Sequence, residues 1–196
     1  MFRFIWNLLA LIGLLLVTGV IYMATQLGDG LVNLRSFDEK APAVYLDMAK
    51  KLIETANPAE ATIWKVPVKE GLGWEDVEQT MHFVANEHNL KNVGELPLSE
   101  QVEAMTGQPQ RFLKIYMFCN PLTAAHMFDY SVAFSAYLPC RISLIEDKQG
   151  KLWLYTLNMD MMIHGGKVMP EGLQEEAIAI KDSILDMMNR GATGEF

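Results

Sequence analysis

The feature that most constrains this chain is an N-terminal apolar run. Residues 4–25 (FIWNLLALIGLLLVTGVIYMAT) contain no charged side chain. A bilayer core of ~30 Å is crossed by roughly 20 predominantly apolar residues in a helix. A cleaved secretory signal is the alternative, but its apolar region usually has only ~7–15 residues, and no small-x-small cleavage site follows this run. We therefore predict that residues 1–25 form one uncleaved transmembrane helix.

The charges that flank this run give an orientation. Arg3 and the amino terminus precede it, whereas Asp29, Arg35, Asp38, Glu39 and Lys40 follow it. The difference is small, and by the positive-inside rule it places the N-terminus in the cytoplasm. The protein is then a single-pass protein of a bacterial inner membrane. Its remaining domain faces the periplasm, where disulfide bonds are permitted.

A linker and a helix are predicted between this anchor and the main domain. Residues 26–42 are rich in glycine and charge and end at Pro42, so they form the linker. Residues 43–57 form an amphipathic helix, because apolar side chains recur at helical spacing: Val44, Tyr45, Met48, Leu52 and Ile53. We expect this helix to pack on the domain. A helix lying on the membrane surface is the less favoured alternative, since its polar face is not strongly basic.

Residues 58–196 carry a mixture of strand and helix patterns. Strands are predicted at Thr62–Val68, at Arg111–Cys119, and in a hairpin that pairs Arg141–Glu146 with Leu152–Leu157. Pro67 lacks a donor and indicates an edge strand, whereas Arg111–Cys119 is apolar on both faces and indicates an inner strand.

The predicted helices are Trp74–His88, the segment after Pro121, and the long amphipathic closing helix Glu171–Asn189. Residues 89–110 are irregular, with one short helix from Ser99 to Met105. Because strands and helices do not alternate strictly, we predict one α+β domain with a mainly antiparallel sheet and helices packed on one face.

Two motifs in this domain resemble a known family. Cys119-Asn120-Pro121 is followed by a helix, then by Leu138-Pro139-Cys140-Arg141, a strand, an acidic turn and a second strand. With the strand-turn-helix at residues 62–89, this pattern resembles the bacterial family called domain of unknown function 302. The resemblance covers roughly residues 60–190. It implies a compact α+β domain similar to the TATA-box-binding-protein-like fold, often found as a homodimer, and it implies no activity.

Cys119 and Cys140 are the only cysteines, and three interpretations of them stay open. They form a disulfide, which requires Cα atoms within ~7 Å; they are small buried structural thiols; or they are reactive or metal-binding thiols, since Cys119 precedes a helix N-terminus that stabilises a thiolate. A disulfide requires the helix after Pro121 to break near Asp129, so that the chain doubles back. Asn120, Pro121, Arg141 and His126 are candidate ligand-binding residues because they belong to or adjoin the two motifs.

Sulfur and imidazole groups also suggest a soft metal. Thiolates and thioethers suit Cu(I), and imidazole suits copper, so the candidate metal ligands are Cys119, His126, Met161, Met162 and His164. The alternative is that these methionines fill gaps in the core. Haem is a further alternative, although no CxxCH motif for covalent haem is present. His82 and His88 lack the spacing that brings helix side chains together, and we interpret them as surface residues.

The remaining patterns limit the function. No GxSxG, HExxH or phosphate-binding glycine loop is present. The net charge of −8, without a Lys/Arg cluster, argues against nucleic acid as a partner. We therefore predict a membrane-anchored periplasmic binding or accessory protein, non-catalytic, in a membrane-protein complex or a homo-oligomer. A thiol-dependent redox protein that uses Cys119 and Cys140 and a copper-binding protein are the alternatives.

Overall fold

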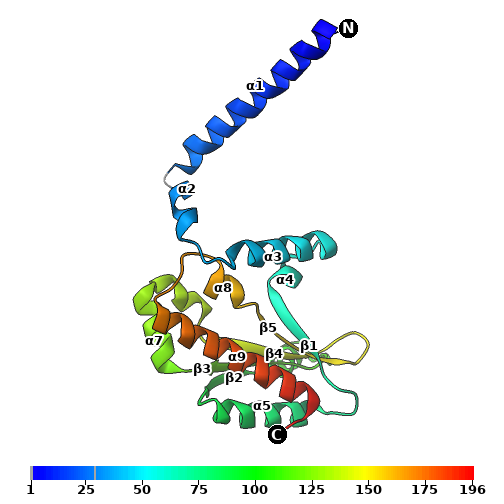
Figure 1. Cartoon of the computed structure of the whole chain (residues 1–196). Helices are drawn as coiled ribbons and strands as arrows, with labels where there is room; N and C mark the ends of the chain where they lie inside the picture. Colours follow the sequence, from blue (N-terminus) through cyan, green and yellow to red (C-terminus); the bar gives the residue numbers. More distant parts are fainter. Residues whose placement is uncertain (1, 29) are drawn as a thin grey trace.

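The chain forms an α+β domain with a long helix extending from it (Figure 1). The structure is a computed structural model and describes residues 2–28 and 30–196; Asp29, one of the charges used for the orientation, lies outside them. The extended helix is α1 (Phe2–Leu27). Its Arg3–Thr25 part is apolar enough to cross a membrane, and none of it is buried against the domain. The predicted N-terminal apolar helix is therefore present.

Five antiparallel strands make one sheet, in the order β1-β5-β4-β3-β2. The strands are β1 (Ile63–Pro67), β2 (Lys91–Leu96), β3 (Leu113–Cys119), β4 (Cys140–Glu146) and β5 (Leu152–Leu157). The predicted fold class and hairpin are confirmed. Pro67 lies on the edge strand β1 and Leu113–Cys119 is an inner strand, as the sequence indicates.

One face of this sheet is covered by two helices, α5 (Trp74–Glu87) and α9 (Glu171–Thr193) (Figure 1). Alternate strand residues point toward them and are fully buried: Tyr116, Phe118, Ile142, Leu144 and Leu154. The two helices also pack closely on each other. A Cβ at Gly191 would lie 2.9 Å from Cγ of Met81, so glycine at this position permits the close approach. The core is therefore the layer between the sheet and the α5–α9 pair.

The sequence did not predict β2, which lies in the segment expected to be irregular. The strand reads KNVGEL, has no alternating apolar pattern and leaves most of its residues exposed. It pairs with β3 through a register shift between Asn92 and Gly94. Tertiary pairing, rather than burial, therefore determines this strand. The short helix predicted next to it is confirmed as α6 (Leu98–Thr106), which ends at the left-handed Gly107.

The predicted linker contains helical turns. Within residues 26–42 lie α2 (Gly30–Asn33) and η1 (Leu34–Ser36). The following helix, α3 (Ala41–Thr55), begins two positions earlier than predicted, because Pro42 occupies its first turn. It ends at Ala56, whose φ is 50°, and Asn57 then caps the short α4 (Pro58–Ala61).

Asp38 attaches this connecting segment to the domain. Its carboxylate is buried and accepts hydrogen bonds from the backbone N–H of Lys40 (2.8 Å) and from Gln174 Nε2 (2.9 Å), and it pairs with Nδ1 of His164 at 2.8 Å. Its own N–H donates to the carbonyl of Gly166. The bond from His164 and the Lys40 N–H outweigh burial and lower the pKa of Asp38.

We expect Asp38→Ala to loosen the connecting segment. It leaves buried donors unsatisfied, at a cost of about 1–3 kcal/mol, so amide exchange at Lys40 should accelerate by about 10- to 100-fold. Because the folded-state pKa of Asp38 is lowered, its contribution is complete above its ordinary value of 3.8 and is lost as the pH falls through the folded-state pKa. Hydrogen exchange with mass spectrometry measures this. Asp47→Ala, which removes an exposed ion pair with Lys51, is the control, and equal acceleration in both variants would contradict the role of Asp38.

Candidate functional site

The first of the two cysteine motifs turns β3 into a helix. Cys119 is the last residue of β3, and α7 (Pro121–Tyr130) begins at Pro121. Oδ1 of Asn120 accepts hydrogen bonds from the N–H groups of Leu122 (3.1 Å) and Thr123 (3.3 Å). Asn120 is therefore the N-cap, and proline opens the helix as its missing donor allows.

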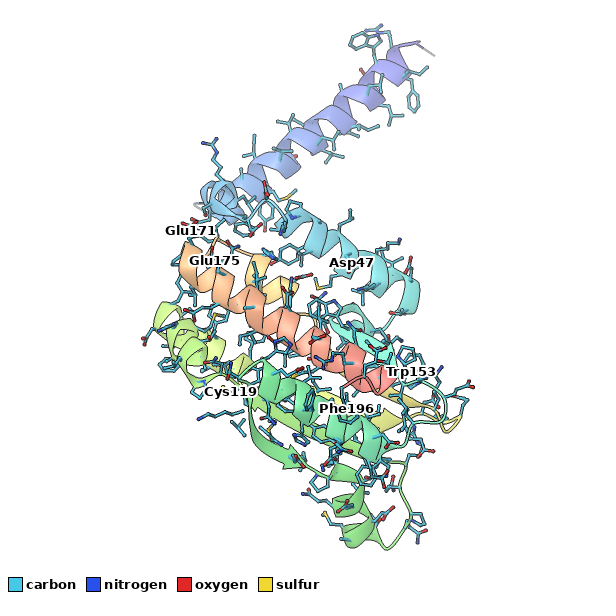
Figure 2. All side chains as sticks on the ribbon, turned by 60° about the horizontal axis from the view of Figure 1, so that its bottom comes forward. Asp47, Cys119, Trp153, Glu171, Glu175 and Phe196 are labelled. Carbon is cyan, nitrogen blue, oxygen red and sulfur yellow. The ribbon has the colours of Figure 1, made fainter. Side chains whose placement is uncertain are left out.

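The second motif returns the chain to the same end of the sheet. The helix α7 ends at Tyr130, and a 3-10 segment, η2 (Val132–Tyr137), leads back to Cys140. Cys140 pairs in register with Phe118, next to Cys119. Figure 2 shows Cys119 at this end of the sheet, beside α7. The predicted break near Asp129 is thus confirmed. Both thiols are free in the structure, and a disulfide between them stays a prediction.

Two small cavities lie around these cysteines, and we call them the sulfur cavities. The first, of about 40 Å³, contains both Cys119 and Cys140 in its wall. The second, of about 50 Å³, lies on the Arg141 side of Cys140. Their walls share Cys140, Met159 and Met162. Each has the volume of only a few water molecules at ~10–15 Å³ apiece.

A larger groove adjoins the sulfur cavities, and we call it the aromatic groove. Its volume is about 590 Å³, within the ~300–1,000 Å³ typical of small-molecule sites. Met162 lines the groove and both sulfur cavities. Its other walls come from α3, the end of α7, η2, α8 (Asp160–His164) and the chain after α8: Tyr45, Tyr130, Ser131, Ala133, Phe134, Tyr137, Met161, Gly165, Gly166, Lys167 and Met169. The groove is therefore rich in aromatic rings and sulfur, and it also contains polar groups, among them Ser131 and Lys167.

The environment of the two thiols keeps them protonated. Burial raises the pKa of Cys119. Burial, followed by the proximity of Cys119, raises the pKa of Cys140 to about 11. Since the thiolate is the reactive and metal-binding form, neither thiol is activated at neutral pH, although Cys119 precedes a helix N-terminus.

We expect slow alkylation of Cys140 in the folded protein. At pH 8 its thiolate fraction is about 10²-fold below that of an ordinary cysteine with a pKa of ~8.5. Iodoacetamide labelling of the full chain, followed by peptide mass spectrometry from pH 7 to 11, measures the rate. The urea-unfolded protein is the control and should react at the ordinary rate. Equal rates at pH 8 in the folded and unfolded states would contradict the raised pKa.

The structure gathers only part of the predicted copper ligands. Cys119 and Met162 line the first sulfur cavity, and Met161 lines the second. His126 is exposed and pairs with Glu176 on α9 at 3.0 Å. His164 is buried against Asp38. The two imidazoles therefore pair with carboxylates on different elements, and neither is among the residues that line the sulfur cavities.

The remaining predicted ligand-binding residues lie at the rim. Arg141 lines the second sulfur cavity and is exposed. Asn120 lines the first cavity, with its side chain oxygen committed to the cap of α7. Pro121 is exposed at the start of that helix.

Sequence reasoning missed a polar cluster on the helix-covered side of the sheet. Lys114 Nζ lies 2.8 Å from Glu78 and 2.7 Å from Glu95, His82 Nε2 lies 3.2 Å from Glu95, and the Tyr116 hydroxyl donates to Glu78 at 2.6 Å. The interpretation of His82 as a plain surface residue was incomplete, and the i, i+4 spacing of Glu78 and His82 was the available signal.

This cluster has the ligand types of a metal site, since Glu78, His82 and Glu95 offer oxygen and nitrogen atoms within 4.8 Å of one another. The Lys114 ammonium already lies against both carboxylates, and its positive charge offsets their mutual repulsion. We therefore interpret the cluster as a stabilising ion network.

Comparisons with known proteins agree with the fold. The model of the family "Domain of unknown function DUF302" matches residues 64–191. The structure is similar to the crystal structure of an uncharacterized conserved DUF302 protein from Bacillus stearothermophilus, with a TM-score of 0.54 and 16% sequence identity. That similarity covers 66% of this chain and 97% of the other. No curated protein matches the chain.

Proposed function

This chain belongs to the DUF302 family, and we propose that it is a membrane-anchored binding protein that holds a small apolar molecule in the aromatic groove. In this proposal the protein acts without catalysis, as an accessory subunit of a membrane complex or as a homo-oligomer. Its domain lies on the periplasmic side of a bacterial inner membrane. The observation that carries the proposal is the aromatic groove, because its volume of about 590 Å³ and its lining both suit a small apolar ligand.

The lining of the groove supports adaptable binding. Three tyrosines give large rigid apolar surfaces with a polar tip, and methionine side chains adjust their shape to irregular ligands. The sulfur cavities beside Met162 add small apolar recesses for a methyl group or a short chain end. A ligand in this groove would contact α3, η2 and α8 together.

The alternatives have less support. The pKa values of both cysteines are raised, which weighs against a thiol-dependent redox function. His126 and His164 are paired with carboxylates outside the sulfur cavities, which weighs against the predicted copper set. The groove requires neither a thiolate nor a metal to bind an apolar molecule.

Native mass spectrometry of the full chain, extracted in mild detergent without chelators, tests this proposal. Met162→Glu places a carboxylate where the groove and both sulfur cavities meet. Met105→Glu, at a side chain that is 86% exposed on α6, is the matched control. We expect an organic adduct, distinct from detergent, on the wild-type and Met105→Glu proteins and its loss from Met162→Glu.

Two outcomes would overturn the proposal. One is a wild-type protein without any organic adduct. The other is an adduct that Met162→Glu retains in full while its circular dichroism shows a folded domain. A bound copper ion in place of the organic adduct would favour the soft-metal alternative.

A further inference from the structure

The helix α3 is apolar on more of its circumference than its packing requires. One side contacts α4 and α8 and includes Val44 and Met48, which are partly buried. The hydroxyl of Tyr45 donates to the carbonyl of Gly165 at 2.6 Å and fixes the helix on this side. Ala41, at the start of the helix, is buried as well, so this side of α3 forms its attachment to the domain.

A second apolar stripe runs along the outer side of α3. Pro42, Leu46, Ala49 and Ile53 follow one another at intervals of four, three and four residues, which places them on one face of a helix. All four are exposed, and Leu46 and Ile53 retain 71% and 83% of their accessible surface. We call these four residues the outer stripe. Exposure of such an apolar stripe to water is unfavourable, so we infer that an apolar partner covers it.

The position of α3 indicates what that occupant is. The apolar span ends at Thr25, and α3 begins at Ala41 after a connection that contains two helical turns. With its helical residues rising ~1.5–2 Å each and the others at most ~3.5 Å each, such a connection covers at most roughly 35–40 Å. In Figures 1 and 2, α3 lies between α1 and the rest of the domain. The side of α3 that faces away from α4 and α8 therefore lies on the side of the domain where the anchor arrives.

We propose that α3 is an interfacial membrane helix whose outer stripe inserts among the lipid chains at the bilayer surface. The proposal rests on the anchoring stated under the proposed function and adds a second membrane contact. A protein partner fits less well, since four side chains are far fewer than the ~20–30 residues per side of a stable interface. Lipid chains need no such area, because the anchor already holds α3 at the bilayer at high effective concentration.

The charges on α3 define the kind of lipid surface. Lys51 pairs with Asp47 at 2.8 Å, and Lys50 lies 3.9 Å from Glu54. The polar side is therefore charge-balanced, unlike the basic faces of helices that bind anionic lipids from solution. Insertion of α3 depends on its apolar stripe, and it should occur equally in zwitterionic bilayers.

This contact orients the ligand site. Tyr45 belongs to α3 and lines the aromatic groove. With the outer stripe in the bilayer, the groove lies beside the lipid headgroups rather than in open solvent. An apolar ligand can then pass between the bilayer and the groove over a short path.

Site-specific photocrosslinking in vesicles of 1-palmitoyl-2-oleoyl-phosphatidylcholine tests the proposal. The full chain is reconstituted with p-benzoyl-phenylalanine in place of Leu46 or Ile53. Matched controls carry it in place of Asp47 or Glu54 on the polar side of α3, and a further sample carries it in place of Leu16 in α1. Mass spectrometry then measures the adduct with one phosphatidylcholine. We expect lipid adducts at positions 46 and 53 that exceed those at 47 and 54 several-fold.

The outcomes separate this inference from the proposed anchoring. Lipid adducts at position 16, with none at 46 and 53, would overturn the inference and leave the anchor intact. Crosslinks from 46 and 53 to a second copy or to another protein would also overturn it, in favour of a protein partner. An absence of lipid adducts at position 16 would overturn the anchor and the inference together.

Discussion

Replacing Phe118 by alanine should lower the free energy of unfolding of the domain by about 3–5 kcal/mol, the usual cost of removing a buried aromatic ring. The Phe118 side chain is fully buried on β3, between the sheet and its covering helices, and it also lines the first sulfur cavity. Alanine would merge its volume with that cavity. Urea unfolding of the full chain in detergent, followed by tryptophan fluorescence, measures the change.

Phe83→Ala is the control for this substitution. Phe83 is 42% exposed on α5 and contacts Phe196 near the C-terminus, so its removal should cost less than about 1 kcal/mol. A loss below about 1 kcal/mol for Phe118→Ala would contradict the location of the core between the sheet and the α5–α9 pair.

Lys114→Met should destabilise the domain by about 2 kcal/mol at pH 7. Exposed ion pairs contribute ~0–1 kcal/mol, and breaking a fully buried pair costs ~3–5 kcal/mol. We expect an intermediate loss here because the Lys114 and Glu78 side chains are 15% and 23% exposed. The substitution leaves the carboxylates of Glu78 and Glu95 close together without their cation. Urea unfolding at several pH values measures the effect.

The pH dependence of this loss has a definite sign. Burial alone would raise the pKa of Glu95, but the hydrogen bonds from Lys114 and Asn92 outweigh it, and the pKa is lowered. The contribution of Glu95 is therefore present above its ordinary value of 4.5 and is lost as the pH falls through the folded-state pKa. Burial alone would lower the pKa of Lys114, but its bonds to Glu78 and Glu95 raise it, so its contribution persists until the pH rises through that folded-state pKa.

The difference between wild type and Lys114→Met should accordingly be largest near neutral pH and shrink below pH 4.5. Lys65→Met is the matched control, because it removes a more exposed pair with Glu60 and should cost at most about 1 kcal/mol. A loss for Lys114→Met that does not change between pH 7 and pH 3.5 would indicate a packing effect instead of an electrostatic one.

The sequence predicts the fold well where side chains alternate or recur in register with the core. The inner strand β3 and the helix α5 have such patterns, and the structure confirms both. The edge strand β2 has none, because its position is set by pairing with β3 and neither of its faces is deeply buried. Local apolar patterns indicate which side chains are buried. They therefore do not predict a strand that is held mainly by backbone pairing.

The candidate site was predictable in part for a similar reason. The predicted break near Asp129 allowed Cys119 and Cys140 to lie at one end of the sheet, and the structure places them there. The aromatic groove could not be predicted, since Tyr45 and Met162 are far apart in the sequence and meet only through the docking of α3 on α8. The spacing of the histidines likewise did not predict that His126 pairs with Glu176 and His164 with Asp38.

Intact mass spectrometry of the protein, extracted gently from its native membrane, determines whether it is an anchored binding domain. We expect the protein to stay in the membrane fraction after an alkaline wash, and we expect the gently extracted protein to have the mass of the full chain with a bound organic molecule. A soluble protein that lacks the first ~25 residues, the length of a spanning segment, and carries no ligand would contradict it.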